Sequence, residues 1–293
     1  MPKYEVIQVD AFTSRPLEGN PCAVLPDARG LDDAQLQKIA REMNLSETAY
    51  VFAGERSDFR VRYFTPAWEL PMAGHPTIST VHVLCELGRI SPKTASVTLE
   101  MPAGVIPVRI ERGNGASRYV MQQLAPKFMR TYPHAHFAHA LGLAVGDLLD
   151  GVFPQTVSTG TPQLMIALRS TEALARCKPR PAALFEEVDD ADYRSVHVFA
   201  HERDGSVALR ARHFADFNGS LIEDPFTGSA SGGMAAYCAF YGLLSERSYW
   251  IAQGDHAGRP GIGHVRVIGE PDAIESVEIA GEVVTVMRGE LVI

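Results

Sequence analysis

The stretch Glu69-Leu70-Pro71-Met72-Ala73-Gly74-His75 recurs later in the chain as Glu223-Asp224-Pro225-Phe226-Thr227-Gly228-Ser229. The Glu, Pro and Gly residues keep the same spacing in both copies. Each copy follows a segment with a strand-like pattern and precedes one with a helix-like pattern. The repeat therefore predicts two related halves, each with a polar loop at the start of a helix.

A helix start of this kind is suited to binding an anion. The first backbone N–H groups have no partner within the helix, and the helix dipole is positive at this end. Two such loops facing each other would form a cleft for a small carboxylate. We therefore expect a small carboxylated substrate as the partner of this protein.

The length of the chain favours two domains, because 293 residues exceed the size of most single cores. We expect a first domain over residues 1–120, which contains the loop 69–75 and is completed by a C-terminal strand from 280–293. The second domain is expected over residues 121–279, with the loop 223–229.

The composition excludes several classes of protein. The net charge is −8, from 27 basic and 35 acidic residues, and no run of Lys or Arg occurs, which argues against nucleic acid as a partner. No apolar stretch of about 18 residues occurs and the N-terminus does not resemble a signal peptide, so we expect no membrane partner and a cytoplasmic location. The cysteines lie far apart in sequence, which argues against structural zinc and a disulfide framework (Cys22, Cys85, Cys177, Cys238).

Both helices that follow the loops are apolar on more than one face. The first covers 77–87 after Pro76, and the second runs from Ser229 to Gly242. A helix that is apolar nearly all round is a buried one. Short strands flank both helices, at 4–12, 21–25, 48–53, 59–65, 95–101, 104–110, 117–122, 156–159, 163–168, 195–200, 206–214, 276–279, 282–287 and 290–293. We expect the strands of each half to curl around its central helix.

Five stretches of this sequence resemble the phenazine-biosynthesis, PhzF-like isomerase family. They are GNPCAVL (19–25), LSETAYVF (45–52), YFTPAWELPMAGHPT (63–77), EDPFTGSASGG (223–233) and QGDHAGRPG (253–261). The resemblance spans nearly the whole chain. It implies an α+β fold like that of diaminopimelate epimerase, with two pseudo-symmetric domains. Each domain is a curved, mostly antiparallel, barrel-like sheet around a central helix, and the active site lies between them.

The resemblance also implies which residues act on the substrate. It gives Glu47 the role of general acid/base in a cofactor-independent proton transfer, with polar active-site roles for His75 and Asp224. The Gly74 and Gly228 amides and Ser229 would hold the substrate carboxylate. Asn20 would add a side-chain amide, and the assembly expected for the family is a homodimer.

Each of these residues also has a purely structural interpretation. Glu47 would be a solvated loop residue, His75 a helix cap and Asp224 a turn residue before proline. Asn20 would belong to a plain Gly-Asn-Pro turn. Ser229 is a good N-cap by residue type, a role that is compatible with binding a carboxylate.

The loops lack the paired cysteines that racemases and epimerases of this fold use as opposed bases. Ala73 precedes Gly74 in the first loop, and the second loop has no cysteine. We therefore expect one-base isomerisation, while a binding module without turnover and an epimerase remain alternatives. His134, His136 and His139 have the spacing of a metal site but no acidic or cysteine partner nearby in sequence, so we predict no metal ligands.

Overall fold

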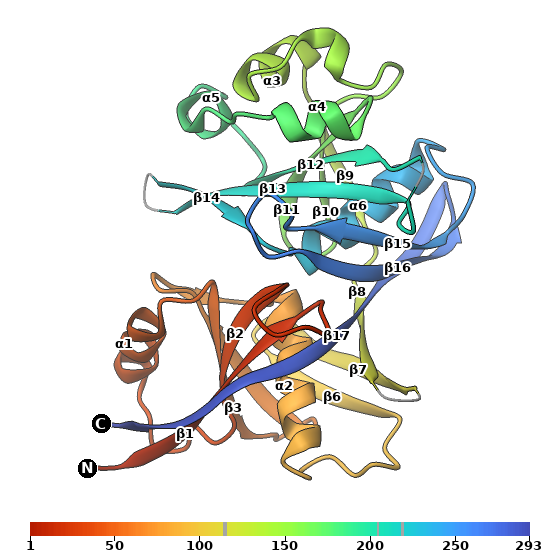
Figure 1. Cartoon of the computed structure of the whole chain (residues 1–293). Coiled ribbons are helices and arrows are strands. Elements are labelled where there is room, and N and C mark those ends of the chain that lie inside the picture. The colour runs from red at the N-terminus through yellow and green to blue at the C-terminus, as the bar shows by residue number, and fades with distance from the viewer. Residues whose placement is uncertain (114–115, 204, 218–219) are drawn as a thin grey trace. The chain divides into compact units, whose positions relative to one another are not determined.

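The computed structural model describes residues 1–113, 116–203, 205–217 and 220–293, and the chain divides into two compact units (Figure 1). The first unit comprises Met1–Gln122 together with Ala280–Ile293. The second comprises Gln123–Ile279. The C-terminal segment therefore returns to the unit in which the chain begins.

The first unit is a curved sheet with one helix inside it and one outside. Its elements are β1 (Lys3–Ala11), β2 (Asn20–Leu25), α1 (Asp33–Met43), β3 (Glu47–Ala53), β4 (Phe59–Phe64), β5 (Glu69–Leu70), α2 (Gly74–Glu86), β6 (Ser96–Met101), β7 (Gly104–Arg112), β8 (Ser117–Gln123) and the later part of β17 (Ala273–Val292). Strand β17 pairs with both β1 and β8. The order of pairings therefore returns to its starting strand, as in a barrel.

The second unit repeats the arrangement with more helices outside. Its elements are β9 (Lys127–Thr131), α3 (His134–Ala140), a 3₁₀ turn (Val145–Asp147), β10 (Gln155–Ser158), β11 (Pro162–Leu168), α4 (Thr171–Arg176), α5 (Pro181–Phe185), β12 (Ser195–His201), β13 (Leu209–Phe217), β14 (Ser220–Asp224), α6 (Gly228–Phe240), β15 (Ser248–Gln253), β16 (Gly261–Glu270) and the start of β17.

The two units share one succession of strand pairings. In the first, β1–β2 is antiparallel, β2–β3 parallel, β3–β4 and β4–β5 antiparallel, β4–β6 parallel and β6–β7 antiparallel. In the second, the same succession runs through β10, β11, β12, β13, β14, β15 and β16. The repeated loops occupy equivalent places, between β5 and α2 and between β14 and α6. The expected α+β class, with a mostly antiparallel sheet around a helix in each half, is confirmed.

Helices α2 and α6 are the enclosed ones. Apolar residues of α2 such as Ile78, Val81 and Leu84 are buried, and so is nearly every residue of α6 through Cys238. The Phe199 ring of β12 meets the Tyr237 ring of α6 edge to face, with centroids 5.7 Å apart. The prediction from their all-round apolar pattern is confirmed.

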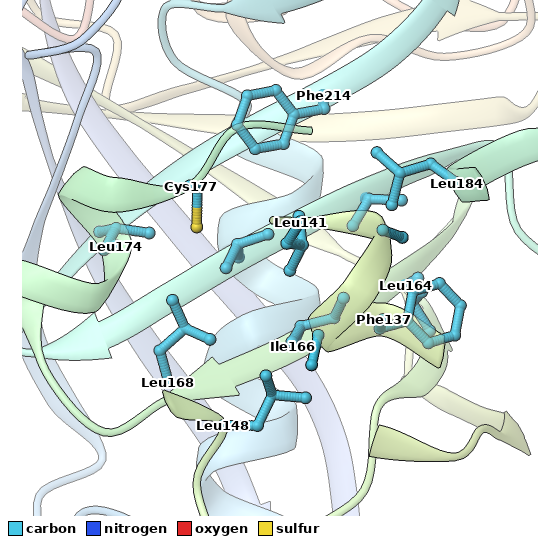
Figure 2. Close-up of a cluster of buried hydrophobic side chains, with 14 of the residues drawn as sticks. Phe137, Leu141, Leu148, Leu164, Ile166, Leu168, Leu174, Cys177, Leu184 and Phe214 are labelled. Atoms are coloured by element: carbon cyan, nitrogen blue, oxygen red, sulfur yellow. The ribbon is translucent and has the colours of Figure 1, made fainter. Parts of the chain in front are cut away.

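The outer face of each sheet carries the remaining helices. In the first unit, Leu36 and Ile39 of α1 pack with Leu25, Tyr50 and Phe64. In the second, α3, α4 and α5 cover the sheet with the apolar cluster that Figure 2 shows, in which Phe137, Leu141, Leu174 and Leu184 meet Ile166 and Phe214. Alternate strand residues thus face the central helix or the outer helices.

Some boundaries differ from the sequence prediction. Helix α2 begins at Gly74 instead of Pro76, and α6 begins at Gly228 with Thr227 as its N-cap, so the prediction of Ser229 as N-cap is wrong. The predicted strands 276–279, 282–287 and 290–293 form one strand, β17. Strands β5, β9, β14, β15 and β16 were not predicted. Helix starts shift easily because neither cap residue makes a side-chain cap bond.

Gly281 in β17 permits close packing on Phe12, which gives the first prediction. A Cβ atom at Gly281 would lie 2.4 Å from Cδ1 of Phe12, whose side chain is fully buried. We expect Gly281→Ala to lower the free energy of unfolding by about 1–3 kcal/mol, as overpacking does. Urea unfolding curves would measure the change.

Gly289→Ala is the matched control in the same strand, because a Cβ atom there meets nothing within 4 Å. Its effect should stay within about 0.5 kcal/mol. Equal effects of the two substitutions would contradict the packing argument.

Candidate active site

The first unit brings Glu47 and His75 into contact. Glu47 is the first residue of β3 and His75 the second residue of α2. The His75 Nε2 atom lies 3.1 Å from Oε2 of Glu47, and the two side chains are 6% and 18% exposed. The two residues are 28 positions apart in sequence, and they meet because α2 enters the sheet beside the start of β3. A largely buried carboxylate next to an imidazole is an arrangement suited to proton transfer.

A hydrogen-bonded group supports this pair from the side of β2. The Ser46 hydroxyl donates to Oδ1 of Asn20 at 3.0 Å and lies 3.5 Å from Nε2 of His75. Asn20 itself is fully buried at the start of β2. Sequence reasoning did not single out Ser46, although it stands directly before Glu47 in the stretch LSETAYVF.

Burial determines the charge states in this group. It lowers the pKa of His75 to about 3, and a hydrogen bond to the Pro21 backbone only partly opposes this effect. The imidazole is therefore neutral near pH 7, with one N–H group that can donate a hydrogen bond and one nitrogen that can only accept. Burial, together with the nearby Glu47 carboxylate, raises the pKa of the Cys22 thiol well above its usual value. Cys22 therefore stays protonated and is no competing base.

In the second unit, the structure places Asp224, Gly228 and Ser229 around the start of α6. Asp224 ends β14, and its Oδ2 atom accepts a hydrogen bond from the Thr227 hydroxyl. Gly228 and Ser229 are the first two residues of α6. Figure 1 shows α6 within the strands of this unit. The second-loop residues are thus brought together locally, as the first-loop residues are.

The repeated glutamate has the same structural role in both loops. Glu69 receives two hydrogen bonds from the Arg62 guanidinium, at 2.7 and 2.6 Å. Glu223 receives two from Arg212, at 2.9 and 2.7 Å. Each arginine also lies over the ring of the phenylalanine two residues later, Phe64 or Phe214, at 5.1 and 5.0 Å. Bidentate pairs fix orientation, so the shared glutamates hold the loops in place.

Two buried histidines lie in register with Asp224 on the sheet of the second unit. His197 is opposite His213, and His213 is opposite Asp224. Directly opposite residues share a face of the sheet, and the two Nδ1 atoms of the histidines are 3.2 Å apart. Burial lowers the pKa of His213 to about 3 and that of His197 well below its usual value. Both rings are therefore neutral near pH 7. Sequence reasoning missed this pair.

The three histidines with metal-like spacing make other contacts. His136 Nε2 is 2.7 Å from the Ala183 carbonyl oxygen, and His139 Nε2 is 3.0 Å from a nitrogen of Arg180. The ring of His134 lies against that of Phe153. Across the part of the chain that the structure describes, no group of three or more His, Cys, Asp or Glu residues is arranged to hold a metal ion.

Within the described residues, no helix has the length and apolar character needed to cross a membrane.

The buried neutral His213 predicts a loss of stability in acid. Its pKa is about 3 in the folded protein and about 6.5 when unfolded, so below pH 6.5 the unfolded chain binds more protons. Stability is therefore lost as the pH falls from about 6.5 toward 3. We expect His213→Asn to reduce the slope of unfolding free energy against pH by about 1.4 kcal/mol per pH unit in this range. Urea unfolding at several pH values would measure it.

His256→Asn is the control for this experiment, because His256 is exposed. That variant should keep the wild-type slope. An unchanged slope in His213→Asn would show that His213 is not held neutral by burial.

The comparisons with known proteins agree with this architecture. The family model described as phenazine biosynthesis-like protein matches residues 9–289. The trans-2,3-dihydro-3-hydroxyanthranilate isomerase of Pseudomonas fluorescens is 34% identical, over 99% of this chain and 100% of that protein.

Solved structures show the same fold. The crystal structure of a phenazine biosynthesis protein of the PhzF family from Bacillus anthracis has a TM-score of 0.89 and 33% identity, with 100% of both chains covered. A hydroxyproline epimerase from Agrobacterium vitis has a TM-score of 0.64 at 12% identity, over 99% of this chain and 92% of that chain. The latter likeness concerns the fold alone.

Proposed function

The chain belongs to the phenazine biosynthesis-like family of isomerases, and from this premise we propose that it moves a proton between two carbon atoms of a small carboxylated metabolite. In the proposal, Glu47 is the single acid/base and no cofactor takes part. The observation that carries it is the contact of Glu47 with a buried, neutral His75 at the start of α2.

Glu47 supplies the proton transfer. Its side chain is 18% exposed and Oε2 is buried, so a substrate carbon would approach the other carboxylate oxygen. It would take a proton from one carbon and return it to another on the same face of the substrate. The residues that precede Gly74 and Gly228 are Ala73 and Thr227, so neither loop offers a thiol as an opposing base.

His75 would stabilise the negative charge that develops when the proton leaves. A neutral imidazole can donate a hydrogen bond to an enolate-like oxygen or nitrogen without first losing a proton itself. We assign Asn20 to positioning, because its buried side chain accepts from Ser46 beside His75.

The backbone amides at a helix start would bind the substrate carboxylate. Gly74 opens α2 and Gly228 opens α6, where the dipole favours an anion. Ser229 would add a hydroxyl donor, and Asp224 would accept from an amino or hydroxyl group of the substrate. These roles rest on the sequence repeat and on membership of the family.

The relative from Pseudomonas fluorescens indicates which substrate to test first. Its name specifies trans-2,3-dihydro-3-hydroxyanthranilate, a compound with the carboxylate, amino group and hydroxyl group that these roles require. A binding module without turnover and an epimerase are the competing functions. The epimerase would need a second base opposite Glu47.

Substitution of Glu47 gives the main prediction. In deuterated water, the wild-type protein should convert this substrate with deuterium appearing at the carbon that gains a hydrogen. Glu47→Gln should lower kcat by at least about 10²-fold, because the amide cannot accept the proton. NMR of the product and initial rates would measure both effects.

Glu111→Gln is the control for this substitution, since Glu111 pairs with Arg109 and Arg118 away from His75. It should keep full activity. A Glu47→Gln variant with wild-type kcat would overturn the mechanism. A wild-type protein that binds the substrate with neither product formation nor deuterium exchange would favour the binding module.

His75 gives a separate prediction because it acts on the transition state. We expect His75→Phe to lower kcat by about 10²–10³-fold with a smaller change in KM, as removal of a transition-state hydrogen bond does. Steady-state kinetics would separate the two constants. A rise in KM with unchanged kcat would instead place His75 in ground-state binding.

A further inference from the structure

Ser229, the second residue of α6, receives a hydrogen bond from a buried glutamine. Nε2 of Gln163 lies 3.1 Å from Oγ of Ser229. Gln163 belongs to β11 and is 3% exposed, whereas Ser229 is half-buried. The glutamine is therefore fixed in the interior, while Ser229 is only partly covered.

The direction of this bond determines what the serine can do. A hydroxyl that accepts a hydrogen bond from an amide still has its own proton to donate. Among the residues that the structure describes, the Ser229 hydroxyl has no protein acceptor for that proton. The O–H group is thus available to a ligand at the start of α6.

The other atom of the Gln163 amide has no partner in this orientation. Its Oε1 atom is buried and has no hydrogen-bond partner among the described residues. Such an atom has lost its hydrogen bonds to water without replacing them, so it calls for an explanation. Rotating the amide would satisfy Oε1 with the Ser229 proton, but the Nε2 donors would then lose their partner. The observed orientation keeps the serine proton free.

Two further buried glutamines hold the neighbouring residues of the loop. Gln123 Nε2 donates to the Gly228 carbonyl at 2.8 Å, while its Oε1 accepts from Thr159 at 2.6 Å. Gln253 Nε2 donates to the Asp224 carbonyl at 2.8 Å. Their side chains are 2% and 1% exposed. All three are uncharged, so they fix the loop without adding a negative charge that would repel an anion.

We propose that Gln163 is a positioning residue that directs the Ser229 hydroxyl toward the substrate carboxylate. This inference rests on the proposed role of Ser229 in carboxylate binding. It adds a specificity element, because a donor with a fixed direction recognises an acceptor such as a carboxylate better than a freely rotating hydroxyl does.

Gln163→Glu tests the direction of the bond with an almost identical shape. A carboxylate at this position can only accept hydrogen bonds, so it would accept one from the Ser229 hydroxyl. It would also place a negative charge near the start of α6. We expect the Kd of anthranilate, measured by calorimetry on the full chain, to rise about 10- to 100-fold. Gln155→Glu is the matched control, because Gln155 is also buried but bonds to Tyr241 and Met129.

The double variant Gln163→Glu/Ser229→Ala distinguishes positioning from a general structural effect. If Gln163 acts through Ser229, the Kd of the double variant should match that of Ser229→Ala alone. If Gln163→Glu does not fold, as judged from its melting curve, Gln163→Met removes the donor without adding a charge. The same comparison with Ser229→Ala then applies.

The outcomes separate the inference from the function on which it rests. The proposed role of Ser229 in carboxylate binding would be wrong if Ser229→Ala bound anthranilate with the wild-type Kd, or if the wild type did not bind anthranilate. The inference about Gln163 would then fall as well. If Ser229→Ala weakens binding, two results overturn the inference alone. One is a Gln163→Glu effect no larger than that of Gln155→Glu, and the other is additive effects in the double variant.

Discussion

The enclosure of α2 and α6 is the constraint on which the rest of the structure depends. Both helices are apolar nearly all round, so neither can lie on a surface, and each is surrounded by the strands of its own unit. An enclosed helix must enter through an opening in its sheet. The loop that leads into it is therefore held by the surrounding strands, and the repeated Glu-x-Pro-x-x-Gly motif occupies that place in both units.

Shared and unshared residues of the motif have different roles. The shared glutamates bind arginines of β4 and β13, and these pairs fix each loop on its sheet. The unshared residues are those to which we assign roles in the proposed reaction. His75 contacts Glu47 in the first unit, and Asp224 and Ser229 are held by neutral groups in the second. The two halves have thus kept one scaffold and diverged in side-chain chemistry.

Much of the fold was predictable because it depends on patterns that are local in sequence. The all-round apolar character of α2 and α6 predicts their burial, and the repeated motif predicts two related halves. Glu47 and His75 were proposed as site residues through the family resemblance, and Nε2 of His75 lies 3.1 Å from Oε2 of Glu47 in the structure. The Ser46 and Gln163 contacts were not found. These contacts depend on which face of a strand meets the end of a helix. The sequence positions of residues 163 and 229 do not indicate that their side chains meet. Likewise, the single long strand β17 looks interrupted in sequence because of Gly281 and Gly289, although Gly289 keeps its place opposite Val6 of β1.

The claim that one base transfers the proton can be tested by following the hydrogen itself. The wild-type protein would be given substrate deuterated at the carbon that loses its hydrogen, in ordinary water under single-turnover conditions, and the product analysed by mass spectrometry and NMR. A single carboxylate that removes and returns the proton predicts that a fraction of product molecules keeps the deuterium at the new carbon, in one stereochemical form. Complete loss of deuterium together with a mixture of stereoisomers would contradict the account and indicate two opposed bases.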